Sequence, residues 1–256
     1  MLRDLVSEQE GISTNAISRL QYHRGTPDLY LEFCVRTDRN YQDIRDRHYI
    51  PNAGACGQQI HFLIRYKNEI VGIISGGSAV YATRKRDEFF QITHNTRENT
   101  LNGIINNTVF RLEENESNLA TRCLSMWRSI VSYLWESAYE VKVFGFETFV
   151  VEEDFRKGTL YKADNWELVG ETSGSTKSHH GVGLTGGVSK RKKIEPKLVF
   201  CKWHQDHRKP IHNDYVASWR GRTPEEKARA KRLQKFRQSC RGQKFCAVEN
   251  NVLLVR

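Results

Sequence analysis

Residues 104–172 constrain the fold of this chain more than any other stretch. The β-branched run IINNTVFRL at 104–112 has no glycine or proline and predicts a strand. Residues 119–138 place apolar side chains three and four positions apart, which predicts an amphipathic helix capped by Asn115 or Ser117. Residues 141–151 predict a buried strand, 154–165 a short helix and 166–172 a further strand. This alternation is the pattern of parallel α/β packing.

A motif closes this stretch: FETFV at 146–150 and GTLYKADNWELVGET at 158–172. It resembles the closing motif of GNAT-type acyltransferases, in which a helix ending in Tyr-x-x-x-aromatic precedes a last strand. Residues 147–166 also resemble the motif of the DruA-like anti-phage defence family. His48 and Tyr49 resemble an element of the Mom family, which modifies adenine in phage DNA. The resemblance covers about residues 45–205 and implies an α/β, GNAT-like acyltransferase fold with a mixed, centrally splayed sheet.

We expect three segments along the chain. Residues 1–35 would form an N-terminal helical segment and first strand, 36–205 a GNAT-like catalytic domain, and 206–256 a basic C-terminal extension. Within the domain, two alternating runs around Lys67-Asn68-Glu69 predict a hairpin, and Gly76 and Gly77 suggest a bulge in its second strand. The polar residues 82–103 read as a variable insertion near the site, and residues 197–204 as another strand.

The net charge of +10 is concentrated in one tract. Residues 190–245 hold 18 Lys and Arg against 5 Asp and Glu, so the remainder is slightly acidic. Such asymmetry indicates a polyanion, here double-stranded DNA, although a solvated tail is the alternative. Thr223, Pro224 and Glu226 predict a helix start in this tract. The candidate DNA-binding residues are Lys190, Arg191, Lys192, Lys193, Lys227, Arg229, Lys231, Arg232 and Lys235.

Five residues are candidate catalytic groups. The Mom resemblance points to His48 and Tyr49, for which a hydrogen-bonded loop pair is the alternative. Arg111 ends a strand where the implied fold opens its sheet, so it could hold an anion, or it could pair with a neighbouring glutamate. Glu147 places a carboxylate in a strand that is otherwise apolar and buried. Such a carboxylate is costly unless it forms a salt bridge or serves the site, and the resemblance implies an acidic site residue there. The resemblance also implies Tyr161 as a general acid, although a core tyrosine would look the same.

Further polar residues could bind substrate or donor. Asn106 and Asn107 point to opposite faces of their strand, so at least one amide faces inward and needs a partner. The other candidates are Ser117, Thr148 and Asn165. We predict that His48, Arg111, Glu147 and Tyr161 surround one hollow in the splayed sheet.

The acyl donor is left open by the sequence. A coenzyme A thioester suits the implied fold, but the loop before the long helix reads EENESNLAT, without the glycines that usually cradle the pyrophosphate. Cys201, His204, His207 and His212 fit no standard zinc spacing, so we expect no metal. We expect no membrane span and, since residues 1–11 lack an apolar signal core, a cytoplasmic protein with reduced cysteines.

The sequence therefore supports two classes of function. One is a Mom-type transferase that adds a small acyl-derived group to a DNA base, with adenine the expected base, after flipping it, with Tyr49, Tyr81 or Trp166 stacking on the base. The other is a non-catalytic DNA-binding defence protein of the DruA type, and a protein N-acyltransferase is a third reading. The oligomeric state is not indicated.

Overall fold

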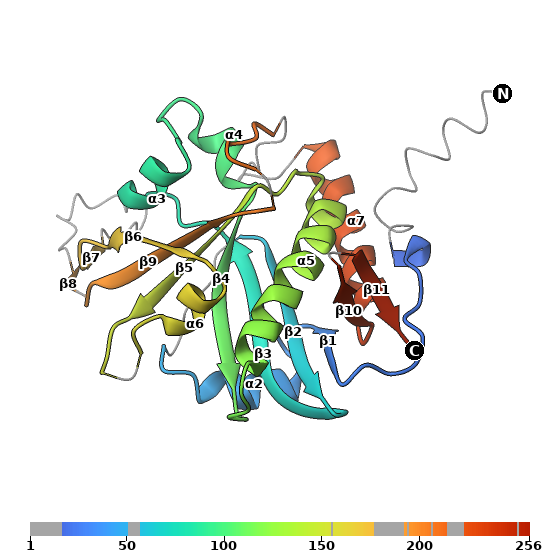
Figure 1. The fold of residues 1–256 in the computed structure, drawn as a ribbon. Helices are drawn as coiled ribbons and strands as arrows, with labels where there is room; N and C mark the ends of the chain where they lie inside the picture. Colours follow the sequence, from blue (N-terminus) through green and yellow to red (C-terminus); the bar gives the residue numbers. More distant parts are fainter. Residues whose placement is uncertain are drawn as a thin grey trace.

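The computed structural model describes residues 17–50, 57–154, 156–176, 192–193, 195–205, 207–213, 223–249 and 251–256. Their centre is a nine-stranded mixed sheet in the order β11-β10-β1-β2-β3-β4-β5-β9-β6 (Figure 1). The strands are β1 (Leu29–Cys34), β2 (Gln59–Tyr66), β3 (Glu69–Ser78), β4 (Ile104–Leu112), β5 (Gly145–Val151), β6 (Glu167–Glu171), β9 (Lys197–Trp203), β10 (Lys244–Val248) and β11 (Asn251–Val255). A separate pair joins β7 (Ser175–Thr176) to β8 (Lys192–Lys193).

The antiparallel half of the sheet contains the predicted hairpin. β2 and β3 pair from Gln59↔Gly77 to Tyr66↔Glu69, and the turn between them is Lys67-Asn68. Both turn residues have positive φ, +49° and +70°, as a twisted two-residue hairpin requires. The hairpin prediction is therefore confirmed, with Glu69 already in the strand.

The sheet opens between β4 and β5. These strands run parallel and pair from Ile104↔Gly145 to Asn106↔Glu147, although each continues beyond that point. On its other side β4 shifts register against β3 between Ser75 and Gly76, the bulge suggested by the glycines. The fold class predicted from the sequence, a mixed α/β sheet splayed at its centre, is confirmed.

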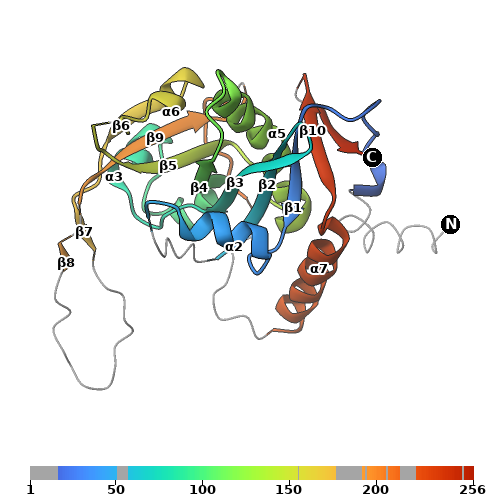
Figure 2. The ribbon, with the colours of Figure 1, turned by 90° about the horizontal axis from the view of Figure 1, so that it is seen from below.

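Helices cover both faces of the sheet (Figure 2). One face carries α5 (Leu119–Tyr139) and α6 (Thr159–Ala163), and the other carries α2 (Arg39–Asp46), α3 (Arg84–Phe89) and α4 (Arg97–Leu101). Neighbouring strand residues divide between these layers because strand side chains alternate. Ile105 belongs to the cluster under α5, whereas Ile104 packs with Phe90 and Leu101 of the opposite layer.

Several predicted boundaries are wrong. The N-cap residue of α5 is Asn118, so neither Asn115 nor Ser117 is the cap. Asn118 has a left-handed backbone (φ +60°), and its side chain makes no capping hydrogen bond. β5 begins only at Gly145, because the buried residues before it bond to loops, as when the Phe144 N–H donates to Gly103. The helix expected at 154–165 is restricted to α6, and the insertion at 82–103 contains α3 and α4.

The basic C-terminal extension is not confirmed as an appendage. β10 pairs with β1 through Leu31↔Phe245 and with β11, so the described C-terminal strands extend the main sheet. Helix α7 (Pro224–Cys240) starts at the predicted capping box of Thr223 and Glu226. It buries Phe236 in the cluster that surrounds α5. A short 3-10 turn, η1 (Ile17–Arg19), lies at the start of the described chain, and residues 1–16 of the expected N-terminal helical segment lie outside the described residues.

Candidate active site

Three polar side chains meet where β4 and β5 separate. The Tyr161 hydroxyl, from α6, donates to Asn107 Oδ1 at 2.8 Å. Thr148 Oγ1 donates to the Asn107 carbonyl at 3.0 Å and lies 3.4 Å from the Tyr161 hydroxyl. All three residues are at least nine-tenths buried. Buried polar groups of this kind are costly unless they are paired, so their concentration at the opening marks it as the candidate site.

The hydrogen bonds continue from Asn107 into β3 and β2. Asn107 Nδ2 donates to the Ser75 carbonyl at 3.1 Å. The Ser75 hydroxyl in turn contacts the Tyr41 hydroxyl at 2.8 Å and His61 Nδ1 at 3.0 Å. A continuous polar chain thus crosses three strands inside an otherwise apolar core.

Burial keeps this chain of groups uncharged near neutral pH. It raises the pKa of Tyr161 above its ordinary value, against the effect of the Thr148 hydroxyl. It also lowers the pKa of His61 to about 4, helped by nearby arginines such as Arg36. Tyr161 therefore keeps its proton, and His61 is a neutral imidazole.

His48 and Tyr49 form a stacked pair. Their ring centroids are 4.5 Å apart, and the Arg156 guanidinium lies 3.7 Å from the Tyr49 ring centroid. His48 Nδ1 accepts the Ile50 N–H at 3.2 Å. Burial, then the positive charges of Arg45, Arg111 and Arg156, lowers the pKa of His48 to about 4. His48 is therefore a neutral imidazole whose unprotonated Nδ1 is already occupied by the Ile50 N–H.

Arg111 is already engaged by its own surroundings. Its Nε donates to Glu113 at 2.5 Å and its Nη1 to the Arg47 carbonyl at 2.7 Å. The ion pair with a neighbouring glutamate, foreseen as the alternative, is therefore present. The side chain is partly exposed, and anion binding by Arg111 stays a prediction.

Glu147 lies on the opposite face of the sheet from Tyr161. Its neighbour Thr148 points toward Tyr161, so Glu147 must point the other way. There it pairs with Arg86 and accepts the Val80 N–H at 2.7 Å. Burial raises the pKa of the Glu147 carboxyl, and Arg86 opposes that rise. The structure does not place His48, Arg111, Glu147 and Tyr161 around one hollow.

Arg86 is the partner that sequence reasoning missed. Its guanidinium is fully buried, and Nε also donates to Asp87 at 2.7 Å. Glu147 signalled that a buried cation was needed, but Arg84, Lys85, Arg86 and Arg97 all lay in the same polar segment. Nothing local in the sequence separates Arg86 from the others.

Much of the motif around Tyr161 builds the turn that holds it. Gly158 has φ +68°, and a Cβ there would collide with the Phe200 ring. Asp164 Oδ1 and Oδ2 accept the two ends of the Arg128 guanidinium from α5, each at 2.8 Å. Asp164 Oδ2 also accepts the Trp166 indole N–H at 2.8 Å, so Trp166 is a buried anchor and not an exposed stacking platform.

The remaining candidate residues are dispersed. Asn106 is buried on the Glu147 face, where its Oδ1 has no partner among the described residues. Ser117 and Asn165 are exposed, and Asn165 has a left-handed backbone after α6.

On α7, Lys227, Lys231 and Lys235 are exposed, whereas Arg229 and Arg232 lie 3.9 and 3.7 Å from Glu140 at the end of α5. Lys190 and Arg191 lie outside the described residues, and Lys192 and Lys193 form β8.

Comparison of the sequence with protein families identifies its relationship. A family model described as "Druantia protein DruA" matches residues 31–211, which include the polar site and both layers of helices. The chain belongs to this DruA family. No curated protein matches the sequence.

Solved structures of acetyltransferases are more distantly similar. A GNAT family acetyltransferase from Elizabethkingia anophelis shares 8% identity over 69% of this chain and 99% of its own, with a TM-score of 0.42. NAA60 from Arabidopsis thaliana shares 13% identity over 69% and 99%, also with a TM-score of 0.42. The match to the microcin C7 self immunity acetyltransferase MccE spans 57% of this chain and 61% of that one, at 11% identity and a TM-score of 0.33. Nothing about substrate or donor follows from these likenesses.

Three further properties concern the described part of the chain. Its helices include none with the length and apolar content that a membrane span requires. Its His, Cys, Asp and Glu side chains form no group of three that could hold a metal ion. The described cysteines are all buried, and burial raises the pKa of the Cys246 thiol to about 11.

Proposed function

We propose that this DruA-family chain is a cytoplasmic transferase that adds a small acyl-derived group to a base of double-stranded DNA, with adenine the expected target. The observation that carries the proposal is the meeting of Asn107, Thr148 and Tyr161 at the opening between β4 and β5. A buried, hydrogen-bonded cluster at a break in strand pairing serves a substrate better than it serves stability, since apolar side chains would fill the same space at lower cost.

Each group of the cluster has a role that fits its chemistry. Tyr161 holds its proton near neutral pH and can donate it to a leaving group. Asn107 and Thr148 orient the phenol through the bonds described above. His48 is neutral near pH 7, and it could accept the proton that an attacking amine must lose only after the hydrogen bond from the Ile50 N–H to Nδ1 opens.

Coenzyme A fits the described residues poorly as the donor. The loop between β4 and α5 contains Glu113, Glu114 and Glu116, and no glycine. Glu113 pairs with Arg111, and Glu116 accepts the Tyr66 hydroxyl at 2.5 Å. A diphosphate beside these carboxylates would be repelled, and the loop lacks the glycine backbone that usually receives one. The donor that fits is an acyl compound without a diphosphate.

The exposed lysines of α7 support a DNA partner. Lys227, Lys231 and Lys235 lie on the solvent side of a helix that buries Phe236 and Cys240. Lysines in such a row can contact successive phosphates and release counterions. Because chemistry on a base is blocked inside the duplex, the target would have to flip out.

A DNA-binding defence protein without transfer is the second candidate. The closed state of the site favours it, because Tyr161 is only 9% exposed and its hydroxyl already bonds to Asn107. In this case the polar cluster would fix the geometry of the opened sheet, and DNA binding alone would be the activity.

Nucleoside analysis tests the proposal. The protein is expressed with plasmid DNA, the DNA is digested to nucleosides, and mass spectrometry searches for a new adduct. The wild type should produce an adenine adduct, and Tyr161→Phe should abolish it. Tyr30→Phe is the matched control, because Tyr30 is also buried and donates to an amide oxygen, Asn68 Oδ1 at 3.2 Å, far along the sheet. Absence of any adduct together with tight DNA binding would favour the second candidate.

A further inference from the structure

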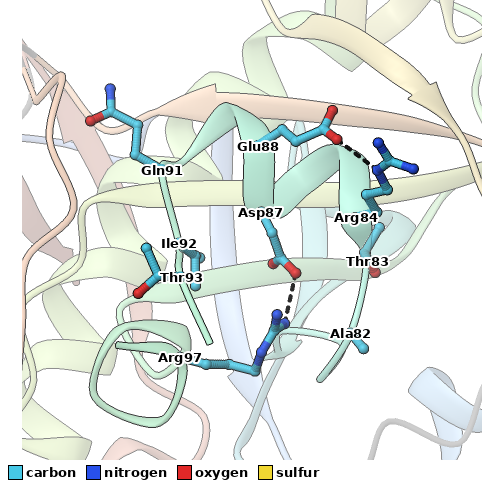
Figure 3. Close-up of a pocket in the computed structure, with 9 residues that line it drawn as sticks. All are labelled: Ala82, Thr83, Arg84, Asp87, Glu88, Gln91, Ile92, Thr93 and Arg97. Atoms are coloured by element: carbon cyan, nitrogen blue, oxygen red, sulfur yellow. Dashed lines mark hydrogen bonds and ion pairs between the residues drawn. The ribbon is translucent and has the colours of Figure 1, made fainter. Parts of the chain in front are cut away.

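A hollow of about 740 Å³ lies beside α3 and α4 (Figure 3). These helices pack on the sheet face opposite Tyr161. Its walls combine hydroxyl, charged and small apolar side chains, with Asp87 and Arg97 meeting across it (Figure 3). The lining residues are Ala82, Thr83, Arg84, Asp87, Glu88, Gln91, Ile92, Thr93 and Arg97. A volume of this size is within the range of small-molecule sites, roughly 300–1,000 Å³.

Buried ion pairs hold the wall of the hollow in place. Asp87 accepts Arg97 Nη1 at 2.6 Å on one oxygen and Arg86 Nε at 2.7 Å on the other. Arg86 continues to Glu147 in the core of the sheet. The wall is thus tied to β5, and its shape is preorganised without a ligand.

Directly before the lining residue Ala82, the aromatic ring of Tyr81 lies beside the guanidinium of the lining residue Arg97. Tyr81 is 61% exposed, which is unusual for so large a ring. The Arg97 guanidinium carbon lies 5.7 Å from the Tyr81 ring centroid, and Arg97 Nη1 donates to the Tyr81 carbonyl at 2.9 Å. Arg84 adds a second cation, with a side chain that is 87% exposed and paired only with the exposed Glu88 among the described residues.

This combination has the chemistry of a nucleotide site. A base can stack on an exposed aromatic ring, and a guanidinium can bind the adjoining phosphate through two donors. Hydroxyl groups such as Thr83 and Thr93 supply hydrogen bonds to a base or sugar edge. An acidic ligand without an aromatic ring would make no stacking contact with Tyr81. An apolar ligand would place apolar surface against the charged guanidinium groups of Arg84 and Arg97.

We propose that this hollow binds one unpaired nucleotide of DNA, with Tyr81 stacking on the base and the exposed guanidinium of Arg84 holding its phosphate, while Arg97 stays paired with Asp87 in the wall. The inference rests on the proposed function only in taking DNA as the partner. The nucleotide bound here is not the flipped target of the proposed transfer, because Tyr161 lies on the other face of the sheet. Glu147 supports the wall of the hollow through Arg86 and so acts as a positioning residue.

Fluorescence anisotropy with a labelled single-stranded oligonucleotide, and with the same sequence as a duplex, tests this inference. Tyr81→Ala should weaken single-strand binding by roughly tenfold, the size expected for one lost base–aromatic stack. Tyr81→Phe should retain binding because the ring remains. Duplex binding, which we assign to α7, should change little in either variant.

Tyr22→Ala is the matched control. Tyr22 is 54% exposed and has the Arg256 guanidinium carbon 4.6 Å from its ring centroid, but it lies beside β11 and far from the hollow in the sheet order. Equal losses in Tyr22→Ala and Tyr81→Ala, or unchanged affinity in Tyr81→Ala, would overturn the inference and leave the DNA partner standing. Failure of the wild type to bind either DNA would overturn both the inference and the proposed DNA partner.

Discussion

Replacing Glu147 by glutamine separates the structural and catalytic interpretations of this residue. In the wild type both carboxylate oxygens are used, one by Arg86 and the other by the Val80 N–H. Glutamine keeps the shape and one acceptor but turns an N–H₂ group toward a donor. Arg86 then retains only Asp87 as an anionic partner, and Asp87 is shared with Arg97.

The expected loss of stability is large because neither Glu147 nor Arg86 is exposed to water. Removing one member of a buried ion pair typically costs about 3–5 kcal/mol, and the retained acceptor places this variant near the lower end. For a chain of this size each kcal/mol shifts Tm by about 2–4 °C, so Tm should fall by roughly 6–12 °C.

Thermal and urea unfolding of the purified protein measure this loss. Glu113→Gln is the control, since Glu113 pairs with Arg111 at the surface, where such pairs contribute at most about 1 kcal/mol. If Glu147→Gln unfolded at the wild-type temperature, the structural interpretation would be refuted. Loss of a DNA adduct in that stable variant would instead indicate a catalytic carboxylate.

Three other outcomes follow from local geometry. Gly158→Ala should lose about 2–4 kcal/mol in urea unfolding, because its left-handed backbone disfavours alanine and the added methyl meets Phe200. The pKa of His61, about 4, lies below its unfolded value near 6.5, so protonation favours unfolding and stability falls as pH drops between these values. His61→Asn should therefore remove roughly 2 kcal/mol of the loss measured between pH 7 and pH 5. Replacing the exposed α7 lysines by alanine should weaken duplex binding. The slope of log K for duplex binding against log salt concentration should become shallower by about 0.9 per lost phosphate contact. The lysines are Lys227, Lys231 and Lys235.

Local patterns predicted the elements whose packing is also local. The β-branched run at 104–112 predicted a strand, and the apolar side chains spaced three and four positions apart predicted a helix. Both elements, β4 and α5, form nearly as expected. Val141, Val143 and Phe144 are equally apolar and are buried in the core clusters. The Val143 and Phe144 N–H groups nevertheless bond to Glu136 and Gly103, and the strand begins only at Gly145. The apolar content of a segment predicts that it is buried. Whether it forms a strand or a loop depends on its backbone hydrogen-bond partners, which come from distant segments of the chain.

The candidate site was predicted in part for the same reason. The motif contains Tyr161 and Thr148, strand alternation made Asn107 a candidate, and the structure brings the three together. Grouping Glu147 with Tyr161 overlooked the alternation of neighbouring strand residues, which is visible in the sequence once Thr148 is assigned to the Tyr161 side. The pairing of Arg86 with Glu147 joins segments far apart in the chain, and no local pattern contains that information.

The position of β10 has a consequence for assembly during translation. Leu31 is made early, but its neighbour Phe245 leaves the ribosome only after all the other described strands except β11. Until then one edge of β1 carries unpaired backbone groups that could recruit strands from other nascent chains. Chaperone dependence and the yield of soluble protein should therefore be most sensitive to changes in the last two strands, far from any site of chemistry.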